Sequence, residues 1–106
     1  MPLTIKVEDF KGKVVANLLD NKGMLNRLVN YCYKNPNLFK VFKYIDLYDD
    51  TTFNSLQVKD LIDDIYKLRS DSDVVDEERV LLLDQLNEFC NKSLEEPHMY
   101  LKFYGD

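Results

Sequence analysis

A short acidic and aromatic stretch contains the residues of this sequence that are best suited to catalysis or binding. Positions 44 to 50 read Y-I-D-L-Y-D-D, which places three aspartates and two tyrosines within seven residues. Aspartates can act as general acid and base or bind a divalent metal ion, and tyrosines beside them are typical of protein-binding surfaces. The side chains concerned are Tyr44, Asp46, Tyr48, Asp49 and Asp50.

The spacing of these aspartates does not fit a calcium loop, which needs oxygen ligands at alternate positions around a glycine. Position 48 is a tyrosine and no glycine follows. The simplest interpretation is a turn before a helix, held by Asx-type hydrogen bonds or by a cap at Asp50 or Thr51. A second interpretation is a protein-binding patch, in which Tyr44 and Tyr48 supply rigid contact area and the aspartates meet Lys or Arg of a partner.

Other reactive groups are few. The three glycines stand far apart, so the sequence has no glycine-rich phosphate loop. His98 is the only histidine, and it has no local serine or cysteine partner for nucleophilic catalysis. Cys32 and Cys90 lie in helical patterns beside apolar residues, so we expect reduced core residues, with a disulfide between them as the alternative. We therefore expect no catalytic residue, no metal and no cofactor.

The charge balance indicates the kind of partner. The chain has 19 acidic and 14 basic residues, a formal net charge of -5. Binding of duplex nucleic acid requires Lys and Arg to neutralise phosphates, so we do not expect nucleic acid as the ligand. An acidic chain favours association with a basic protein surface. The high aromatic content, seven tyrosines and six phenylalanines, is also compatible with a homodimer.

The elements before the acidic stretch follow from the hydropathy pattern. Apolar and polar residues alternate from position 3 to 8, which predicts a half-buried strand. A turn-like D-F-K-G-K then leads to a second strand over 13 to 19, so the two strands form a hairpin. Apolar residues at three- and four-residue spacing predict an amphipathic helix over 24 to 34. From 36 to 45 the sequence suits only one or two helical turns.

The acidic stretch leads into a helix whose start is encoded by F-N-S-L-Q-V. Asn54 can accept a hydrogen bond from the first turn, and Gln57 can reach back to the N–H of Asn54, which makes a capping box. The helix is predicted over 55 to 69. Its inward face is expected to consist of Val58, Leu61, Ile62, Ile65 and Leu68. Its solvent face is expected to consist of Lys59, Asp60, Asp63, Asp64 and Lys67.

A further helix and a final strand complete the pattern. Acidic residues from Asp76 to Glu78 suit the positive end of a helix that extends to about Ser93. The tail M-Y-L-K-F-Y, 99 to 104, alternates and predicts a strand that pairs with the hairpin. The sequence therefore indicates an α+β fold, a small antiparallel sheet from the N-terminal hairpin and C-terminal strand packed by two or three helices. An all-α bundle with extended tails is the alternative.

Length and composition set the remaining expectations. The 106 residues, 45% of them hydrophobic, suit a single domain over 1–106 with one modest core. No apolar run approaches the roughly 20 residues that span a bilayer, so we expect no membrane association. The first residues, M-P-L-T-I-K-V-E-D, lack the basic and apolar regions of a signal peptide, so we expect the protein to be cytoplasmic.

Two sequence blocks resemble a group of small bacterial proteins of unknown function. That group carries a D-x-T-x-F-N-x-x-Q block and ends in Y-L-x-F-x-G-D. The residues that match are Asp49, Thr51, Phe53, Asn54 and Gln57 in the first block, and Tyr100, Leu101, Phe103, Gly105 and Asp106 in the second. The resemblance covers the C-terminal part of the chain. It implies a shared architecture and a bacterial or phage source, and it implies no mechanism.

These observations favour a non-catalytic acidic protein-binding module. The concrete example is an immunity- or inhibitor-type partner of a basic toxin or nuclease, by analogy with acidic immunity proteins. The residues expected to bind the partner are those of the acidic and aromatic stretch. The alternative is a metal-dependent carboxylate hydrolase or nuclease that uses Asp46, Asp49 and Asp50.

Overall fold

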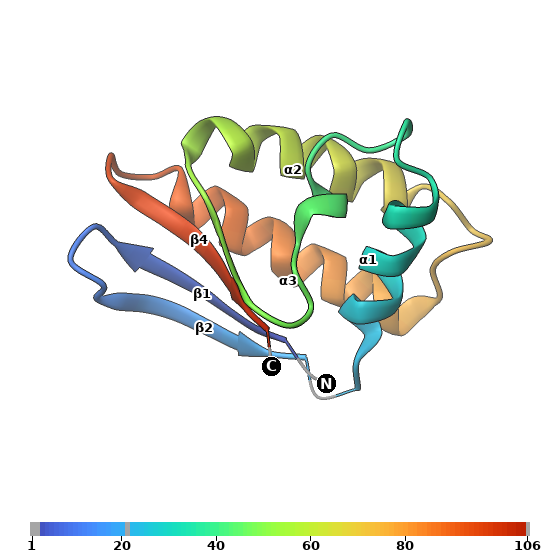
Figure 1. The fold of residues 1–106 in the computed structure, drawn as a ribbon, viewed down its shortest axis with the longest axis horizontal. Coiled ribbons are helices and arrows are strands. Elements are labelled where there is room, and N and C mark those ends of the chain that lie inside the picture. Colours follow the sequence, from blue (N-terminus) through green and yellow to red (C-terminus); the bar gives the residue numbers. More distant parts are fainter. Residues whose placement is uncertain (1–2, 21, 106) are drawn as a thin grey trace.

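The computed structural model describes residues 3–20 and 22–105, which form a four-stranded antiparallel sheet and three α-helices. The elements are β1 (Thr4–Asp9), β2 (Val14–Leu19), α1 (Met24–Lys34), the 3-10 helix η1 (Phe42–Tyr44), β3 (Asp50–Phe53), α2 (Ser55–Arg69), α3 (Glu77–Ser93) and β4 (Met99–Tyr104). Strand order is β2-β1-β4-β3, and α2 and α3 cover one face of the sheet while α1 lies beside them (Figure 1). The α+β fold predicted from the sequence is thus confirmed.

The C-terminal strand β4 lies in the interior of the sheet. It pairs antiparallel with β1 on one side, which confirms the predicted pairing with the hairpin, and with β3 on the other. Met99, Leu101 and Phe103 are buried, and the rings of Phe53 and Phe103 meet edge to face with centroids 5.7 Å apart. Burial of a large apolar side chain contributes about 1.5–3 kcal/mol. Strand β4 therefore joins the two halves of the chain in one core.

Strand β3 was not predicted, and the expectation of a cap at Asp50 or Thr51 is wrong. Both residues lie in β3, opposite Tyr104 and Phe103 of β4, and the helix cap is Asn54, as F-N-S-L-Q-V predicted. The physical reason is that β4 has backbone groups on its second side that also need partners, and Thr51 to Phe53 are β-branched or aromatic residues suited to a strand. At four residues, β3 is too short to show the alternation that predicts a strand.

The helix starts are set by polar side chains. In α2 the capping box is present, since Gln57 N–H donates to Asn54 Oδ1 and Asn54 N–H donates to Gln57 Oε1, both at 3.0 Å. The start of α1 is capped by Asp20, which precedes the helix by four residues. Its buried carboxylate accepts the N–H groups of Met24 at 3.2 Å and Leu25 at 2.7 Å. These bonds satisfy donors that a helix leaves unpaired at its first turn.

Replacement of Asn54 tests how much the α2 cap contributes. We expect Asn54→Ala to lower the free energy of unfolding by about 1 kcal/mol, because the acceptor for the first-turn N–H is lost, and Asn54→Gly by only a few tenths, because glycine leaves that N–H more open to water. Urea denaturation followed by circular dichroism measures both. Equal losses for the two variants would mean that Asn54 has a role other than capping.

Candidate functional site

The carboxylate of Asp64 fixes the segment between α1 and β3. Asp64 is only 1% exposed, so its predicted place on the solvent face of α2 is wrong. Its Oδ1 accepts the N–H of Lys40, and its Oδ2 accepts those of Val41 and Phe42, each at 2.8 Å. These donors stand at the start of η1, where a short helix leaves its first N–H groups without intrahelical partners. A buried carboxylate satisfies them with charge-assisted hydrogen bonds.

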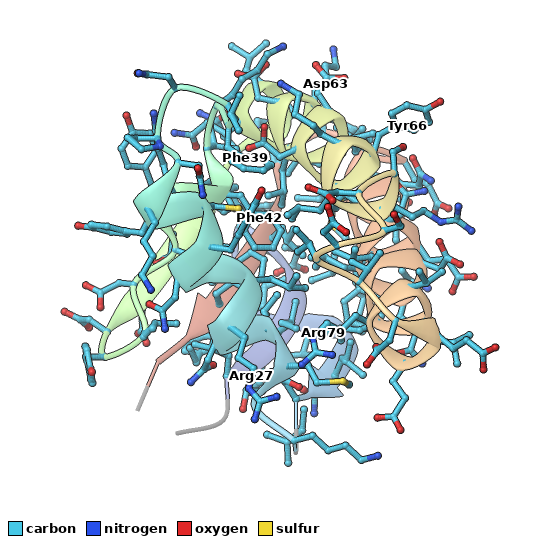
Figure 2. The ribbon with its side chains drawn as sticks, turned by 90° about the vertical axis from the view of Figure 1, so that its right-hand side faces the viewer. Arg27, Phe39, Phe42, Asp63, Tyr66 and Arg79 are labelled. Atoms are coloured by element: carbon cyan, nitrogen blue, oxygen red, sulfur yellow. The ribbon has the colours of Figure 1, made fainter. Side chains whose placement is uncertain are left out.

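The same segment is held by apolar packing and by lysines. Phe39 and Phe42 are buried, and Figure 2 shows them in the space between α1 and α2. Lys67 of α2 donates to the carbonyl of Leu38 at 2.6 Å, and Lys40 meets Asp63 at 2.8 Å. The hydrogen bond to Asp63 raises the pKa of Lys40 above its usual value. The segment is therefore tied to α2 at several points.

The acidic part of the stretch is a turn, as the Asx-type interpretation predicted. Asp46 Oδ1 accepts the N–H of Tyr48 at 2.8 Å, and Asp49 Oδ1 accepts the N–H of Asp50 at 2.8 Å. The N–H of Asp46 in turn donates to the hydroxyl of Thr51 at 2.9 Å. Two of the three aspartates thus use one carboxylate oxygen to shape their own loop.

Gly105 brings the chain end against this loop. Its N–H donates to the carbonyl of Asp49 at 3.0 Å, and a Cβ added to Gly105 would lie 2.5 Å from Asp49 N and 2.8 Å from Leu47 C. Only glycine allows two backbones to approach this closely. The two sequence blocks that carry the resemblance are therefore adjacent in space, through β3, β4 and Gly105. Asp106, the last matching residue, lies outside the described residues.

An open cleft of about 440 Å³ lies between the end of α1 and the loop that leads to β3. It is lined by Asn30, Tyr33, Lys43, Tyr44, Asp46 and Tyr48, together with Ile45 and Leu47. An adjoining hollow of about 280 Å³ shares Tyr33, Lys43 and Tyr44 and adds Pro36. We call the first of these hollows the tyrosine cleft, because Tyr33, Tyr44 and Tyr48 are all exposed there.

The structure brings together three of the five predicted site residues. Tyr44, Asp46 and Tyr48 line the tyrosine cleft, whereas Asp49 and Asp50 are exposed beside it and are not part of its lining. Sequence reasoning missed Asn30, Tyr33 and Lys43. The available indication was Tyr33, an aromatic residue outside the buried stripe of α1.

The reactive groups considered from the sequence lie apart from one another. No group of three or more His, Cys, Asp or Glu side chains within residues 3–20 and 22–105 is arranged to hold a metal ion. His98 is exposed beside Phe10 at the opposite end of β4 from Asp50, which pairs with Tyr104. Cys32 and Cys90 are buried free thiols, and burial raises the pKa of each to about 12. Such thiols are poor nucleophiles.

A second polar cluster lies on the side of the sheet away from the helices. Glu8 is buried there, accepts a hydrogen bond from the hydroxyl of Tyr104 and lies 3.3 Å from the amine of Lys102. Burial, followed by the contact with Glu8, raises the pKa of Tyr104 to about 12. The Tyr104 hydroxyl and the Lys102 amine therefore both serve the buried carboxylate of Glu8.

Comparison with known protein families, with curated proteins and with solved structures found no match to this chain. The resemblance inferred from the two sequence blocks therefore stays a prediction. Within the described part of the chain, none of the helices has the length and apolar character required to cross a bilayer.

Replacement of Asp64 tests whether it positions the segment that forms the cleft. We expect Asp64→Asn to lower the free energy of unfolding by about 3 kcal/mol, because an amide replaces a carboxylate oxygen with a donor that faces backbone N–H groups. Asp63→Asn is the matched control on the outer side of α2 (Figure 2), and it should cost less than about 1 kcal/mol, as exposed ion pairs do. Urea denaturation measures both.

Hydrogen exchange supplies the second measurement. In Asp64→Asn the amides of residues 40 to 42 should exchange faster than in the parent protein, because these are the groups that the carboxylate holds. Unchanged exchange there, or equal destabilisation by both substitutions, would show that Asp64 does not organise the segment.

Proposed function

We propose that this protein is a non-catalytic protein-binding module that receives a basic segment of a partner protein in the tyrosine cleft. The observation that carries the proposal is the gathering of three exposed tyrosines, from two separate parts of the chain, around one open cleft. Tyrosine provides a large amphipathic contact area with few rotatable bonds, and it is enriched among the residues that dominate binding energy.

Charge supports a basic occupant. The lining of the cleft holds one lysine and one aspartate, Lys43 and Asp46, and Asp49 and Asp50 stand exposed beside it. The amine of Lys43 already donates to the carbonyl of Pro36 at 2.7 Å, whereas Asp46, Asp49 and Asp50 are exposed. An arginine of the partner can stack on a tyrosine ring and pair with a carboxylate at the same time. The net charge of -5 would speed the encounter with such a partner.

An immunity- or inhibitor-type role toward a basic toxin or nuclease is the concrete form of this proposal. The support is analogy: acidic charge, small size and a binding surface without catalytic side chains are the properties of that class. The hydrolase alternative lacks comparable support, since Asp46 and Asp49 each direct an oxygen to a backbone N–H and the aspartates do not converge on a common point.

Titration with a short arginine-rich peptide tests the proposal, with nuclear magnetic resonance to locate the binding site. We expect shifts to concentrate on the lining of the tyrosine cleft and Tyr48→Ala to weaken binding at least about tenfold, as loss of an aromatic anchor does. Tyr66→Ala is the matched control, because Tyr66 is 75% exposed on α2 (Figure 2) and Tyr48 is 78% exposed. Equal effects of the two substitutions would indicate nonspecific attraction to the acidic surface and refute the proposal.

The carboxylate contribution is tested separately by Asp46→Asn. Asparagine keeps an oxygen that can accept the N–H of Tyr48, so the loop is retained while the charge is lost. We expect slower association and a weaker dependence on salt concentration. If association is unchanged, the charge of Asp46 does not guide the partner.

A further inference from the structure

The two edges of the sheet differ in how they are protected. Edge strand β3 has four residues, carries Asp50, and is tied to the preceding loop by the bond from Asp46 to Thr51. Edge strand β2 has six residues, V-V-A-N-L-L, with no charged residue and no proline. Its side chains Val14, Val15 and Leu19 are exposed. Monomeric proteins usually protect an edge with charges, proline, a β-bulge or a covering segment. The irregularity in the pairing of β2 lies near its start, at Val14, and the uncharged apolar remainder of the strand is suited to strand pairing.

The backbone register shows which groups of β2 are available. The N–H of Asp20 donates to the carbonyl of Leu3 at 3.0 Å, and Leu18 pairs with Ile5. Because hydrogen-bonded and non-hydrogen-bonded pairs alternate in an antiparallel ladder, the backbone groups of Asn17 and Leu19 point away from β1. The irregularity opposite Val7 and Glu8 interrupts this alternation toward Val14. A new strand would therefore pair mainly through Asn17 and Leu19.

An apolar groove continues from this edge onto α3. A hollow of about 430 Å³ lies between the end of β2 and α3, and its apolar lining includes Leu18, Leu19, Met24, Leu81 and Leu82. Leu81 is 63% exposed on α3, and an ion pair of 3.0 Å between Lys22 and Glu78 stands at the rim. Figure 1 shows β2 at the outer edge of the sheet, opposite the edge that leads to the tyrosine cleft.

We propose that two copies of this chain join through their β2 edges, antiparallel about a two-fold axis at Leu18, and close their apolar grooves against each other. In this arrangement Asn17 of one copy pairs with Leu19 of the other, and the two Leu18 side chains meet at the axis. An antiparallel edge paired with itself is self-complementary, as a two-fold interface requires. The surface that covers each groove is the corresponding β2 edge and groove of the second copy.

Charge explains why this edge suits an identical copy. With a net charge of -5, most surfaces of two copies repel each other, whereas the strand from Val14 to Leu19 has no charge. A ladder through two residues is too small to be stable alone, since specific interfaces bury roughly 1,200–2,000 Å². The apolar residues of the groove, Leu81 and Leu82 of α3 among them, would add to this contact. Both tyrosine clefts stay open in such a dimer, so this inference is independent of the proposed function.

Sedimentation equilibrium of the full chain, over about a hundredfold range of concentration, tests the dimer. We expect the parent protein to approach the mass of two chains as concentration rises. Leu19→Lys and Leu81→Lys should each weaken dimerisation at least about a hundredfold, because each substitution removes an apolar contact and places two like charges in the interface, one from each copy. Leu56→Lys is the matched control, since Leu56 is also a helix residue and is 71% exposed on α2. It should leave the dimer unchanged.

Hydrogen exchange identifies the surface used. The amides of Asn17 and Leu19 should become protected as concentration rises, while circular dichroism confirms that all variants keep the parent fold. A monomer at every concentration, equal weakening by Leu56→Lys, or a dimer in which these two amides stay unprotected would each overturn the proposal. Protection that appears only when an extended peptide of another protein is added would assign the edge to that partner and would overturn it as well.

Discussion

The carboxylate of Asp64 is the interaction on which the candidate site depends. It accepts the backbone N–H groups of Lys40, Val41 and Phe42, which lie between the end of α1 and the start of β3. The segment between α1 and β3 contains only the short helix η1, so it has little regular structure of its own to define its course. The buried hydrogen bonds to α2 give it one position, and that position places Tyr44 beside Tyr33.

The sheet fixes the other end of the same segment. Strand β3 pairs with β4, and Gly105 allows the chain end to approach the backbone of Leu47 and Asp49. The loop from Ile45 to Asp49 is therefore held between α2 at one end and the interior strand β4 at the other. A binding surface on a loop held at both ends loses little conformational entropy when a partner binds.

Much of the fold could be predicted from the sequence because its signals are local. The bounds of α1, α2 and β4 follow from periodicity and from the Asn54 cap. The charge of Asp64 predicts the solvent face of α2, whereas its position in the helix predicts the buried face. Asp64 falls three residues after Leu61 and four before Leu68, on the buried stripe of the helix. Its partners, more than twenty residues away, could not be identified from sequence alone, and neither could the contact of Gly105 with Asp49.

The tyrosine cleft and the β2 edge depend on different parts of the molecule. The cleft needs α1, Asp64 and the loop before β3, whereas the edge and its groove need the N-terminal hairpin and α3. Because β2 and β3 lie at opposite edges of the sheet, pairing through β2 leaves the cleft accessible. A dimer would then carry two clefts, and a partner with two basic segments could bind both at once. The second contact would be intramolecular, which raises the overall affinity without any new contact within a cleft.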